Sequence, residues 1–329
     1  MSNGTAGKQT VLVVGGGEFI DTRLTRALSD SALYEPILLP THADLEAALP
    51  KAAMVVNCVA RRPRTIFAVT QALCDAARRN PPRRIVHLSS MAVYGGTTGV
   101  VDEATELQAP QNDYARARIE SEALIQKYVA DGGDAVMIRP TCMFGPESEP
   151  WVSRIARLLV SRRLGDLGPL GDGICNLIHV DDLADLIILL LSATNVTGEI
   201  FNANADWPRP TWNEFLIRFA HAIGATPIPR ISALRLRGEV KLVAPLLRGT
   251  ALVASRVGAG NIVPDAMTPS FVRTLGQAIT VDSTKASARL GMRYRSLDEM
   301  ISEAAQWWRA QQVKSTPAMQ AGYSDRASS

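Results

Sequence analysis

Apolar residues in this chain fall into two patterns, short continuous runs and longer segments in which they recur every three or four positions. A continuous run bounded by turn residues predicts a buried strand, whereas the longer spacing predicts a helix with one apolar face. Buried strands are predicted at residues 10–14, 35–39, 54–59, 84–89, 135–139 and 198–202. Helices are predicted at residues 19–29, 45–49, 65–79, 114–129, 151–164 and 180–192.

The predicted strands and helices alternate along the first two thirds of the chain, and their connections are short. Strands that are apolar along their whole length and separated by helices are typical of a parallel sheet covered on both faces. We therefore predict an α/β fold with a doubly wound parallel sheet of the Rossmann type.

The alternation becomes irregular in the second half of the chain. Residues 1–150 and 176–204 are assigned to the sheet core, and residues 151–175 and 205–314 to a smaller C-terminal lobe. Residues 315–329 have no periodic apolar positions, so we expect them to form a disordered tail.

Composition excludes several classes of protein. The chain has 329 residues, of which 47% are hydrophobic and 20% are charged, and this balance excludes a wholly disordered protein. The net charge is only +3, and the arginine pairs are dispersed without interleaved aromatic residues. A nucleic-acid partner is therefore not expected.

Cysteines and apolar stretches bear on compartment and membrane association. The four cysteines show no paired spacing, which favours reduced thiols in a cytoplasmic protein and predicts no metal site. The N-terminus lacks the apolar segment of a signal peptide. The longest apolar stretch, residues 183–193, contains Asp185 and is too short to span a bilayer, so no membrane partner is expected.

Residues 11–21, Val-Leu-Val-Val-Gly-Gly-Gly-Glu-Phe-Ile-Asp, are the segment around which the rest of the chain is organised. A buried strand, a glycine turn and a helix in this order open a dinucleotide-binding βαβ unit. Glycine lets the backbone approach a pyrophosphate, which then accepts hydrogen bonds from the free N–H groups of the helix. The predicted cofactor-binding residues of this segment are Gly15, Gly16, Gly17, Phe19 and Ile20.

Further motifs follow in order: 85–95 (Ile-Val-His-Leu-Ser-Ser-Met-Ala-Val-Tyr-Gly), 114–118 (Tyr-Ala-Arg-Ala-Arg), 138–146 (Ile-Arg-Pro-Thr-Cys-Met-Phe-Gly-Pro), 178–184 and 282–291. Together with the glycine segment they show that the chain resembles the extended short-chain dehydrogenase/reductase family, often called NAD-dependent epimerase/dehydratases. The resemblance extends from about residue 9 to residue 311. Each motif is loose, but their order and spacing are specific for the fold.

The resemblance implies an enzyme that uses NAD or NADP on a small-molecule substrate, a secondary alcohol, a ketone or a nucleotide sugar. It assigns Tyr114 as the acid/base and Ser90 as the residue that binds the reacting oxygen. An ordinary phenol is too weak an acid to serve at neutral pH, and Arg118, one helical turn later, would stabilise the phenolate. Ser89 and Arg61, which end or follow two predicted strands, are added to the cofactor-binding residues. Family members are often dimers, so a homodimer is expected.

The chain departs from the family pattern at residues that contact the nucleotide in the family. The second and third glycines of the family's first loop are replaced by Glu18 and Asp21, which add bulk and negative charge and would loosen the packing of helix on strand. Arg118 stands where the family has lysine, and no acidic residue ends the strand at 35–39 to hold an NAD ribose. These changes leave the predicted acid/base pair in place.

Three interpretations remain open at this stage. The first is hydride transfer with NAD or NADP. The second is a non-redox isomerase, lyase or cyclase that uses Tyr114 and Ser90 without a nicotinamide cofactor, and the third is a non-catalytic binding protein. The sequence decides neither the substrate nor the choice between NAD and NADP.

Other conspicuous residues receive structural interpretations. His179 and Asp182 resemble a metal cluster but are expected to form a turn before a buried helix. His87 lies on a predicted core strand and is expected to be a buried imidazole with satisfied nitrogens rather than a base. The apolar, basic segment 234–257 is expected to pack in the core or to cover a substrate.

Overall fold

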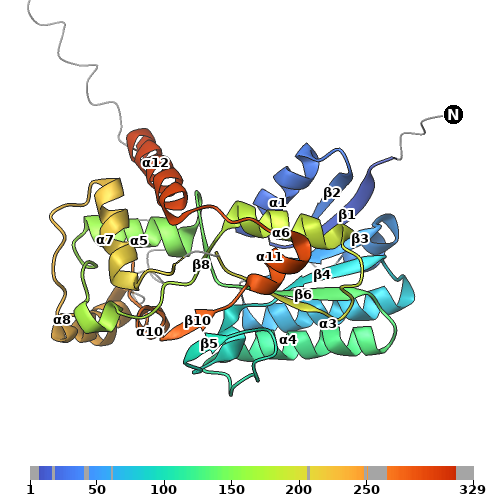
Figure 1. Cartoon of the computed structure of the whole chain (residues 1–329), viewed down its shortest axis with the longest axis horizontal. Helices are drawn as coiled ribbons and strands as arrows, with labels where there is room; N and C mark the ends of the chain where they lie inside the picture. The colour runs from blue at the N-terminus through green and yellow to red at the C-terminus, as the bar shows by residue number, and fades with distance from the viewer. Residues whose placement is uncertain are drawn as a thin grey trace, which may run out of the picture.

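The computed structural model describes residues 7–16, 19–40, 44–60, 62–205, 208–247, 250 and 265–315 (Figure 1). Gly17, Glu18 and Arg61 lie outside these ranges, as do residues 251–257 of the apolar basic segment and residues 316–329 of the predicted tail. Within the described part of the chain, no helix is both long enough and apolar enough to cross a membrane.

A six-stranded parallel sheet forms the centre of the molecule, with the strand order β2-β1-β3-β4-β6-β9. Its strands are β1 (Gln9–Val14), β2 (Tyr34–Leu39), β3 (Met54–Asn57), β4 (Arg84–Leu88), β6 (Ala135–Pro140) and β9 (Ile200–Ala203). All residues of β3, β4 and β6 are buried, which explains why apolar residues dominate these strands. The polar exceptions, Asn57, Arg84, His87 and Arg139, are buried as well. The predicted doubly wound parallel sheet is confirmed.

Helices cover both faces of this sheet (Figure 1). One face carries α1 (Phe19–Asp30), α6 (Val180–Ser192) and α11 (Thr284–Leu290), whose apolar side chains form one core cluster with the strands. The other carries α2 (Leu45–Ala48), α3 (Pro63–Arg79) and α4 (Asp113–Ala130) over a second cluster. Side chains such as Leu24 on the first face and Leu73 on the second are fully buried, so the two faces are sealed from water.

Two short parallel pairs were not predicted. Strand β5 (Gly99–Val101) pairs with β10 (Ile279–Val281), and β7 (Cys142–Phe144) pairs with β8 (Leu177–His179). Each strand has three residues, too few to show a period in the sequence. The pairs nevertheless join segments far apart in the chain at the junction between sheet and lobe.

The C-terminal helices build a lobe beside the sheet (Figure 1). They are α5 (Arg154–Val160), α7 (Trp212–Ile223), α8 (Ala233–Gly238), α10 (Pro269–Leu275) and α12 (Leu297–Ser315). A separate apolar cluster holds them, and in it the rings of Phe144 and Phe215 meet edge to face with centroids 5.4 Å apart. The helix predicted at 151–164 is shorter, because Glu149–Ser153 form a π turn before α5. The exact boundary between core and lobe stays a prediction.

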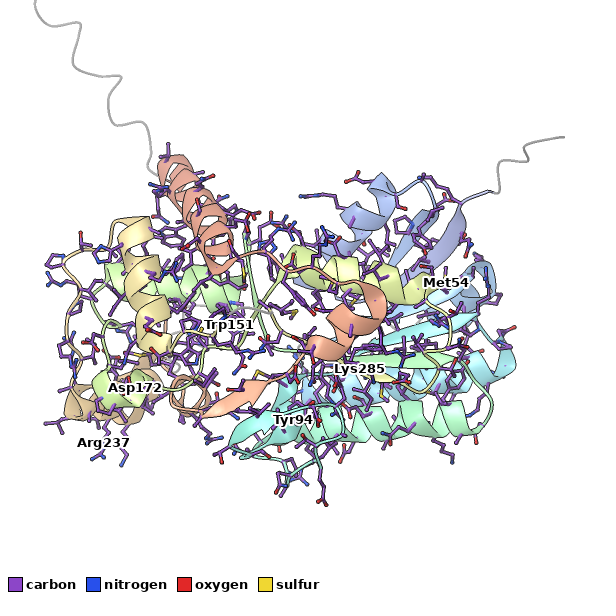
Figure 2. All side chains as sticks on the ribbon, in the orientation of Figure 1. Met54, Tyr94, Trp151, Asp172, Arg237 and Lys285 are labelled. Atoms are coloured by element: carbon purple, nitrogen blue, oxygen red, sulfur yellow. The ribbon has the colours of Figure 1, made fainter. Side chains whose placement is uncertain are left out.

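Because all six strands are parallel, their carboxyl ends lie at one edge of the sheet. Figure 2 shows Met54, the first residue of β3, at the far end of the core, and Trp151 in the lobe. The carboxyl edge and the lobe together enclose the cavity described next.

Candidate active site

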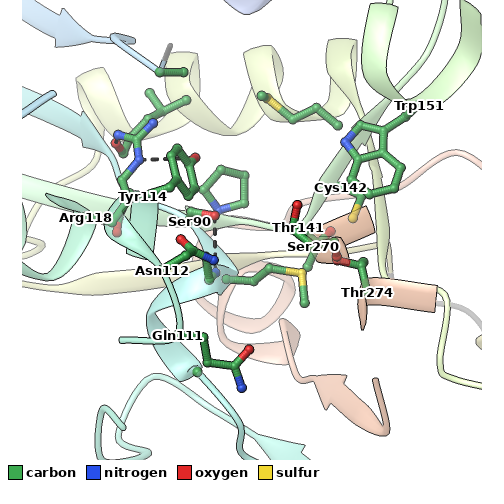
Figure 3. Close-up of a pocket in the computed structure, with 18 of the residues that line it drawn as sticks. Ser90, Gln111, Asn112, Tyr114, Arg118, Thr141, Cys142, Trp151, Ser270 and Thr274 are labelled. Carbon is green, nitrogen blue, oxygen red and sulfur yellow. Dashed lines mark hydrogen bonds between the residues drawn. The ribbon is translucent and has the colours of Figure 1, made fainter. Parts of the chain in front are cut away.

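A cavity of about 600 Å³ lies where the carboxyl ends of β3, β4 and β6 meet the lobe. From the core it is lined by the residues that follow β4, by the first turn of α4 and by Ile20 of α1. From the lobe it is lined by Trp151 and by residues of α10, among them Thr274. Figure 3 shows Ser90, Tyr114 and Arg118 on one side of this space and Trp151 and Cys142 on the other. The structure therefore brings the three predicted catalytic residues into one cavity.

Ser90 is placed by the end of β4. Its extended backbone caps the short helix η3 (Met91–Tyr94), and its hydroxyl oxygen accepts a hydrogen bond from the Ala92 N–H at 3.2 Å. Because the oxygen accepts this bond, the hydroxyl proton remains available to the cavity. The neighbouring Ser89 is buried, and its Oγ has no hydrogen-bond partner among the described residues.

Tyr114 is placed by the start of α4. The Asn112 side chain caps this helix by accepting a hydrogen bond from the Ala115 N–H at 2.9 Å, so Tyr114 falls in the first turn. Its ring is half-buried and lines the cavity. The phenol thus sits on a capped, well-defined helix end.

Arg118 lies one turn further along α4 and contacts the phenol. Its Nε donates to the Tyr114 hydroxyl oxygen at 3.3 Å, and its guanidinium carbon is 5.2 Å from the centre of the ring. Its Nη1 donates to the Leu88 carbonyl at 2.5 Å, and the residue is only 2% exposed. The guanidinium is therefore anchored to β4 while it faces the phenol.

Asp21 does not loosen the packing of α1 on β1, in contrast to the expectation from its position in the glycine motif. The residue is completely buried. A Cβ added to Gly15 would lie 2.1 Å from the Asp21 carboxylate, so the carboxylate occupies the space that a side chain at Gly15 would need. The close approach of helix and strand is preserved because the glycine stands directly after the strand, at Gly15, instead of on the helix.

The predicted cofactor-binding residues divide into three groups. Ile20 and Ser89 line the cavity. Gly15, Gly16 and Phe19 are not among its lining residues, and Phe19 packs against the apolar cluster under α1 and α6. Gly17 and Arg61 lie outside the described residues.

Sequence reasoning missed the lobe side of the cavity. The missed lining residues include Cys142, Met143, Trp151, Ser270, Arg273, Thr274 and Gln277. Arg273 also joins the two sides, because its Nη1 donates to Gln111 Oε1 at 3.4 Å. Ser270, Arg273, Thr274 and Gln277 follow Tyr114 by more than 150 positions. Cys142 and Met143 lie in the motif at 138–146, and Trp151 follows it, but nothing in the sequence points these side chains at Tyr114. Only the fold brings them to the cavity.

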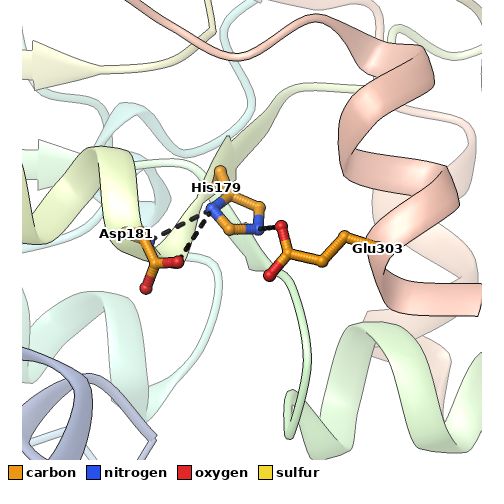
Figure 4. Close-up of side chains that lie close together, drawn as sticks. All are labelled: His179, Asp181 and Glu303. Carbon is orange, nitrogen blue, oxygen red and sulfur yellow. Dashed lines mark hydrogen bonds and ion pairs between the residues drawn. The ribbon is translucent and has the colours of Figure 1, made fainter. Parts of the chain in front are cut away.

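His179, Asp181 and Glu303 form a cluster away from this cavity (Figure 4). The buried imidazole accepts the Asp181 N–H at Nδ1 (3.3 Å), and its Nε2 lies 3.3 Å from the Glu303 carboxylate on α12. Burial lowers the pKa of His179 to about 4, although the Asp181 carboxylate acts in the opposite direction. The cluster joins α12 of the lobe to the start of α6.

Comparisons with known proteins give consistent results. Residues 60–203 match the sequence description of the NAD dependent epimerase/dehydratase family. Protein YeeZ of Escherichia coli (strain K12) is 30% identical over 198 residues, which cover 59% of this chain and 67% of that protein. A UDP-glucose 4-epimerase of Vibrio cholerae is 23% identical over 228 residues, covering 59% of this chain and 70% of the epimerase.

Solved structures with the same fold include a UDP-glucuronic acid 4-epimerase from Bacillus cereus in complex with NAD. It superimposes with a TM-score of 0.71 at 16% identity, over 92% of this chain and 99% of that one. At this identity the likeness concerns the fold alone.

Proposed function

The chain belongs to the NAD-dependent epimerase/dehydratase family of extended short-chain dehydrogenase/reductases, and on that premise we propose that it catalyses NAD(P)-dependent chemistry at a secondary alcohol or ketone. The observation that supports this proposal most directly is the convergence of Ser90, Tyr114 and Arg118 on one cavity. In the proposal Tyr114 is the acid/base, Ser90 binds the reacting oxygen and Arg118 stabilises the phenolate.

The contacts of Tyr114 suit an acid/base. Arg118 donates a hydrogen bond to the phenolic oxygen and places its guanidinium beside the ring, where it can face negative charge that develops on that oxygen during proton transfer. The phenolate could then accept the proton of a substrate hydroxyl in the cavity and return it to a carbonyl oxygen in the reverse direction. The anchoring of Arg118 on the Leu88 carbonyl keeps this charge in place.

The Ser90 hydroxyl can donate a hydrogen bond to a substrate oxygen. Since its Oγ already accepts the Ala92 N–H, the hydroxyl can donate to an alcohol or carbonyl oxygen on the cavity side. That donation would hold the reacting carbon beside Tyr114 and stabilise negative charge as it develops on oxygen.

The position of the cavity supports the binding of a nicotinamide cofactor, although Gly15, Gly16 and Phe19 do not line it. It reaches Ile20 of α1 and Cys58 beyond β3, at the edge of the sheet where dinucleotides bind in this type of fold. The buried Ser89 hydroxyl, which has no partner within the described residues, would gain one from a bound ligand. Ile20, Ser89 and Arg118 would hold such a cofactor, which when bound supplies hydride transfer at the carbinol carbon.

Nucleotide sugars are the first substrates to test. Two of the similar proteins named above are UDP-sugar 4-epimerases, at 23% and 16% identity to this chain. Within the cavity, Arg273 is a cation at the lobe side that could face a phosphate group. We therefore propose a UDP- or dTDP-hexose as the first substrate class.

Two measurements test the proposal. Calorimetric titration with NAD, NADH, NADP and NADPH is expected to show micromolar binding of at least one of them. Epimerisation or dehydration of UDP-glucose and dTDP-glucose is then followed in the wild type, in Tyr114→Phe and in Ser90→Ala. Loss of the acid/base is expected to lower kcat by about 10²- to 10⁴-fold.

Tyr128→Phe is the matched control, because it also removes a tyrosine hydroxyl from α4 but lies in the core away from the cavity. Full activity in Tyr114→Phe would refute the proposal. Tyr114-dependent turnover without binding of any nicotinamide cofactor at millimolar concentration would replace it with the non-redox alternative.

A further inference from the structure

His87 is a buried side chain that the proposed chemistry does not use. It lies in the middle of β4 and is 1% exposed. Its Nδ1 lies 3.2 Å from Asn57 Nδ2 of β3, and its Nε2 lies 3.2 Å from Ser121 Oγ of α4. The expectation of a buried imidazole with satisfied nitrogens is confirmed.

The hydrogen bonds around His87 have one direction. The Asn57 amide nitrogen is only a donor, and its Oδ1 accepts the Val59 N–H at 3.3 Å, so Nδ1 of His87 must accept. The imidazole therefore carries its proton on Nε2 and donates it to Ser121. The Ser121 hydroxyl in turn donates to the Arg118 carbonyl at 2.8 Å. The chain of donors thus ends on the backbone of the residue that contacts the Tyr114 phenol.

A second branch leaves Asn57 towards α3. Its amide nitrogen also lies 3.2 Å from Thr70 Oγ1, and the Thr70 hydroxyl donates to the Ile66 carbonyl at 2.8 Å. The five residues of this network are at most 2% exposed: Asn57, Thr70, His87, Arg118 and Ser121. Asn57, Thr70, His87 and Ser121 therefore cannot exchange their partners for water without local opening of the core.

The network contacts the face of α4 that carries Tyr114 and Arg118. Tyr114, Arg118 and Ser121 stand at positions i, i+4 and i+7 of this helix and therefore share one face. That face meets β4 at two successive residues, since His87 contacts Ser121 and the Leu88 carbonyl accepts from Arg118. Two anchors at adjacent strand residues fix both the rotation and the height of the helix against the strand.

We propose that His87 is a positioning residue for the acid/base, and that it acts through Ser121 by holding Arg118 against the Tyr114 phenol. This inference rests on the proposed roles of Tyr114 and Arg118. Without the imidazole, Ser121 loses its donor, and of the two contacts just described between α4 and β4 only the hydrogen bond from Arg118 to the Leu88 carbonyl remains. With the guanidinium still anchored on β4, a small shift of this turn of α4 would carry Tyr114 away from it and lengthen the 3.3 Å hydrogen bond to the phenolic oxygen.

The neutral state of His87 is part of this arrangement. Burial, and to a smaller extent the positive charge of Arg118, lower the pKa of His87 to about 3. A protonated imidazole would also point an Nδ1–H at the Asn57 donor. The direction of the hydrogen bonds therefore stays constant at every pH at which the phenol would work.

The test measures the ionisation of Tyr114 directly and needs no substrate. The ultraviolet absorbance of phenolate is followed during a pH titration, and each protein is compared with the same protein carrying Tyr114→Phe, so that the difference isolates this phenol. Arg118→Met calibrates the response, because it removes the positive charge next to the phenol and is expected to raise the midpoint. His87→Phe and Ser121→Ala are also expected to raise the midpoint of the Tyr114 titration, by about threefold or more in the ionisation constant.

Three controls separate positioning from general damage to the fold. His87→Gln keeps an N–H donor for Ser121 and is expected to restore the wild-type midpoint. Tyr128→Phe removes a buried hydroxyl from the same helix and is expected to leave the midpoint unchanged. In the Arg118→Met background, His87→Phe is expected to add no further shift, because the two changes act on one interaction.

An unchanged midpoint in folded Ser121→Ala and His87→Phe would overturn the inference while leaving the proposed function intact. An unchanged midpoint in Arg118→Met would overturn the proposed role of Arg118, and with it the inference.

Discussion

The buried ion pair between Glu122 of α4 and Arg139 of β6 gives the sharpest prediction on stability. The pair is bidentate, with Arg139 Nε donating to Oε1 at 3.0 Å and Nη2 to Oε2 at 2.8 Å, and both side chains are at most 3% exposed. Arg139 also donates to the Tyr94 hydroxyl at 3.2 Å. Although burial disfavours its charge, the hydrogen bonds and charge of Glu122 raise the pKa of Arg139 above its ordinary value.

The predicted change in unfolding free energy depends on whether one partner of the ion pair is removed or both are. Glu122→Leu leaves a buried guanidinium without a counter-charge, and Arg139→Met leaves a buried carboxylate in the same condition, so each is expected to cost about 3–5 kcal/mol of unfolding free energy. The double variant removes both charges and fills the space with apolar groups of similar volume. It is expected to lie within about 1 kcal/mol of the wild type.

Urea unfolding followed by tryptophan fluorescence measures all four proteins, with the free energy extrapolated linearly to water. A double variant that loses the sum of the two single costs would show that the residues act independently and would refute the reasoning. A cost below about 1 kcal/mol for either single change would refute it as well, because a buried unpaired charge cannot be that cheap.

Three further predictions follow from the structure. The folded-state pKa of His179, about 4, lies below its ordinary value of 6.5, so the unfolded chain binds this proton first and stability falls as the pH drops from 6.5 to 4. Between pH 7 and pH 5 the unfolding free energy of His179→Asn is expected to fall by about 2 kcal/mol less than that of the wild type. The control His221→Gln, which changes an exposed histidine, is expected to show the same fall as the wild type. Gly15→Ala is expected to destabilise the folded protein by about 1–3 kcal/mol, because the new Cβ would lie 2.1 Å from the Asp21 carboxylate. Adding Asp21→Gly to this variant is expected to restore the midpoint of thermal unfolding. Equal midpoints for the single and the double variant would contradict this explanation. Cys74 and Cys175 are completely buried and do not line the cavity, and burial raises the pKa of both thiols. Both are expected to resist alkylation by iodoacetamide at pH 8 in the folded protein, as measured by mass spectrometry against the urea-unfolded chain.

Most of the fold could be predicted from local patterns. The six strands of the sheet follow from apolar runs such as the one ending at Val14, and their observed ends differ from the predicted ones by at most two residues. Short pairs such as β5 with β10 could not be predicted, because three residues carry no period and their partners are far apart in the chain. The π turn before α5 was missed for a related reason, since the apolar spacing through it continues that of the helix.

The candidate site was predicted in part. Ser90 and Tyr114 could be found because they occupy fixed places in motifs, one after a strand and one at the start of a helix. Asp21 was expected to disturb the glycine loop, and only the structure shows that Gly15 provides the space for its carboxylate. The role inferred for His87 was equally hidden, because the sequence shows a histidine in an apolar run and nothing about its neighbours.

The sequence by itself determined the strands, the helices and the order of the motifs, since these depend on residues that are close together in the chain. The tertiary structure decided which side chains meet. Asn57, His87 and Ser121 come from two strands and a helix, separated by 30 and 34 residues, and they form one directed hydrogen-bond chain only after the core has packed. The lobe side of the cavity has the same origin, because Trp151 and Arg273 reach Tyr114 through the fold alone. Contacts of this kind depend on packing in three dimensions, which no local spacing encodes.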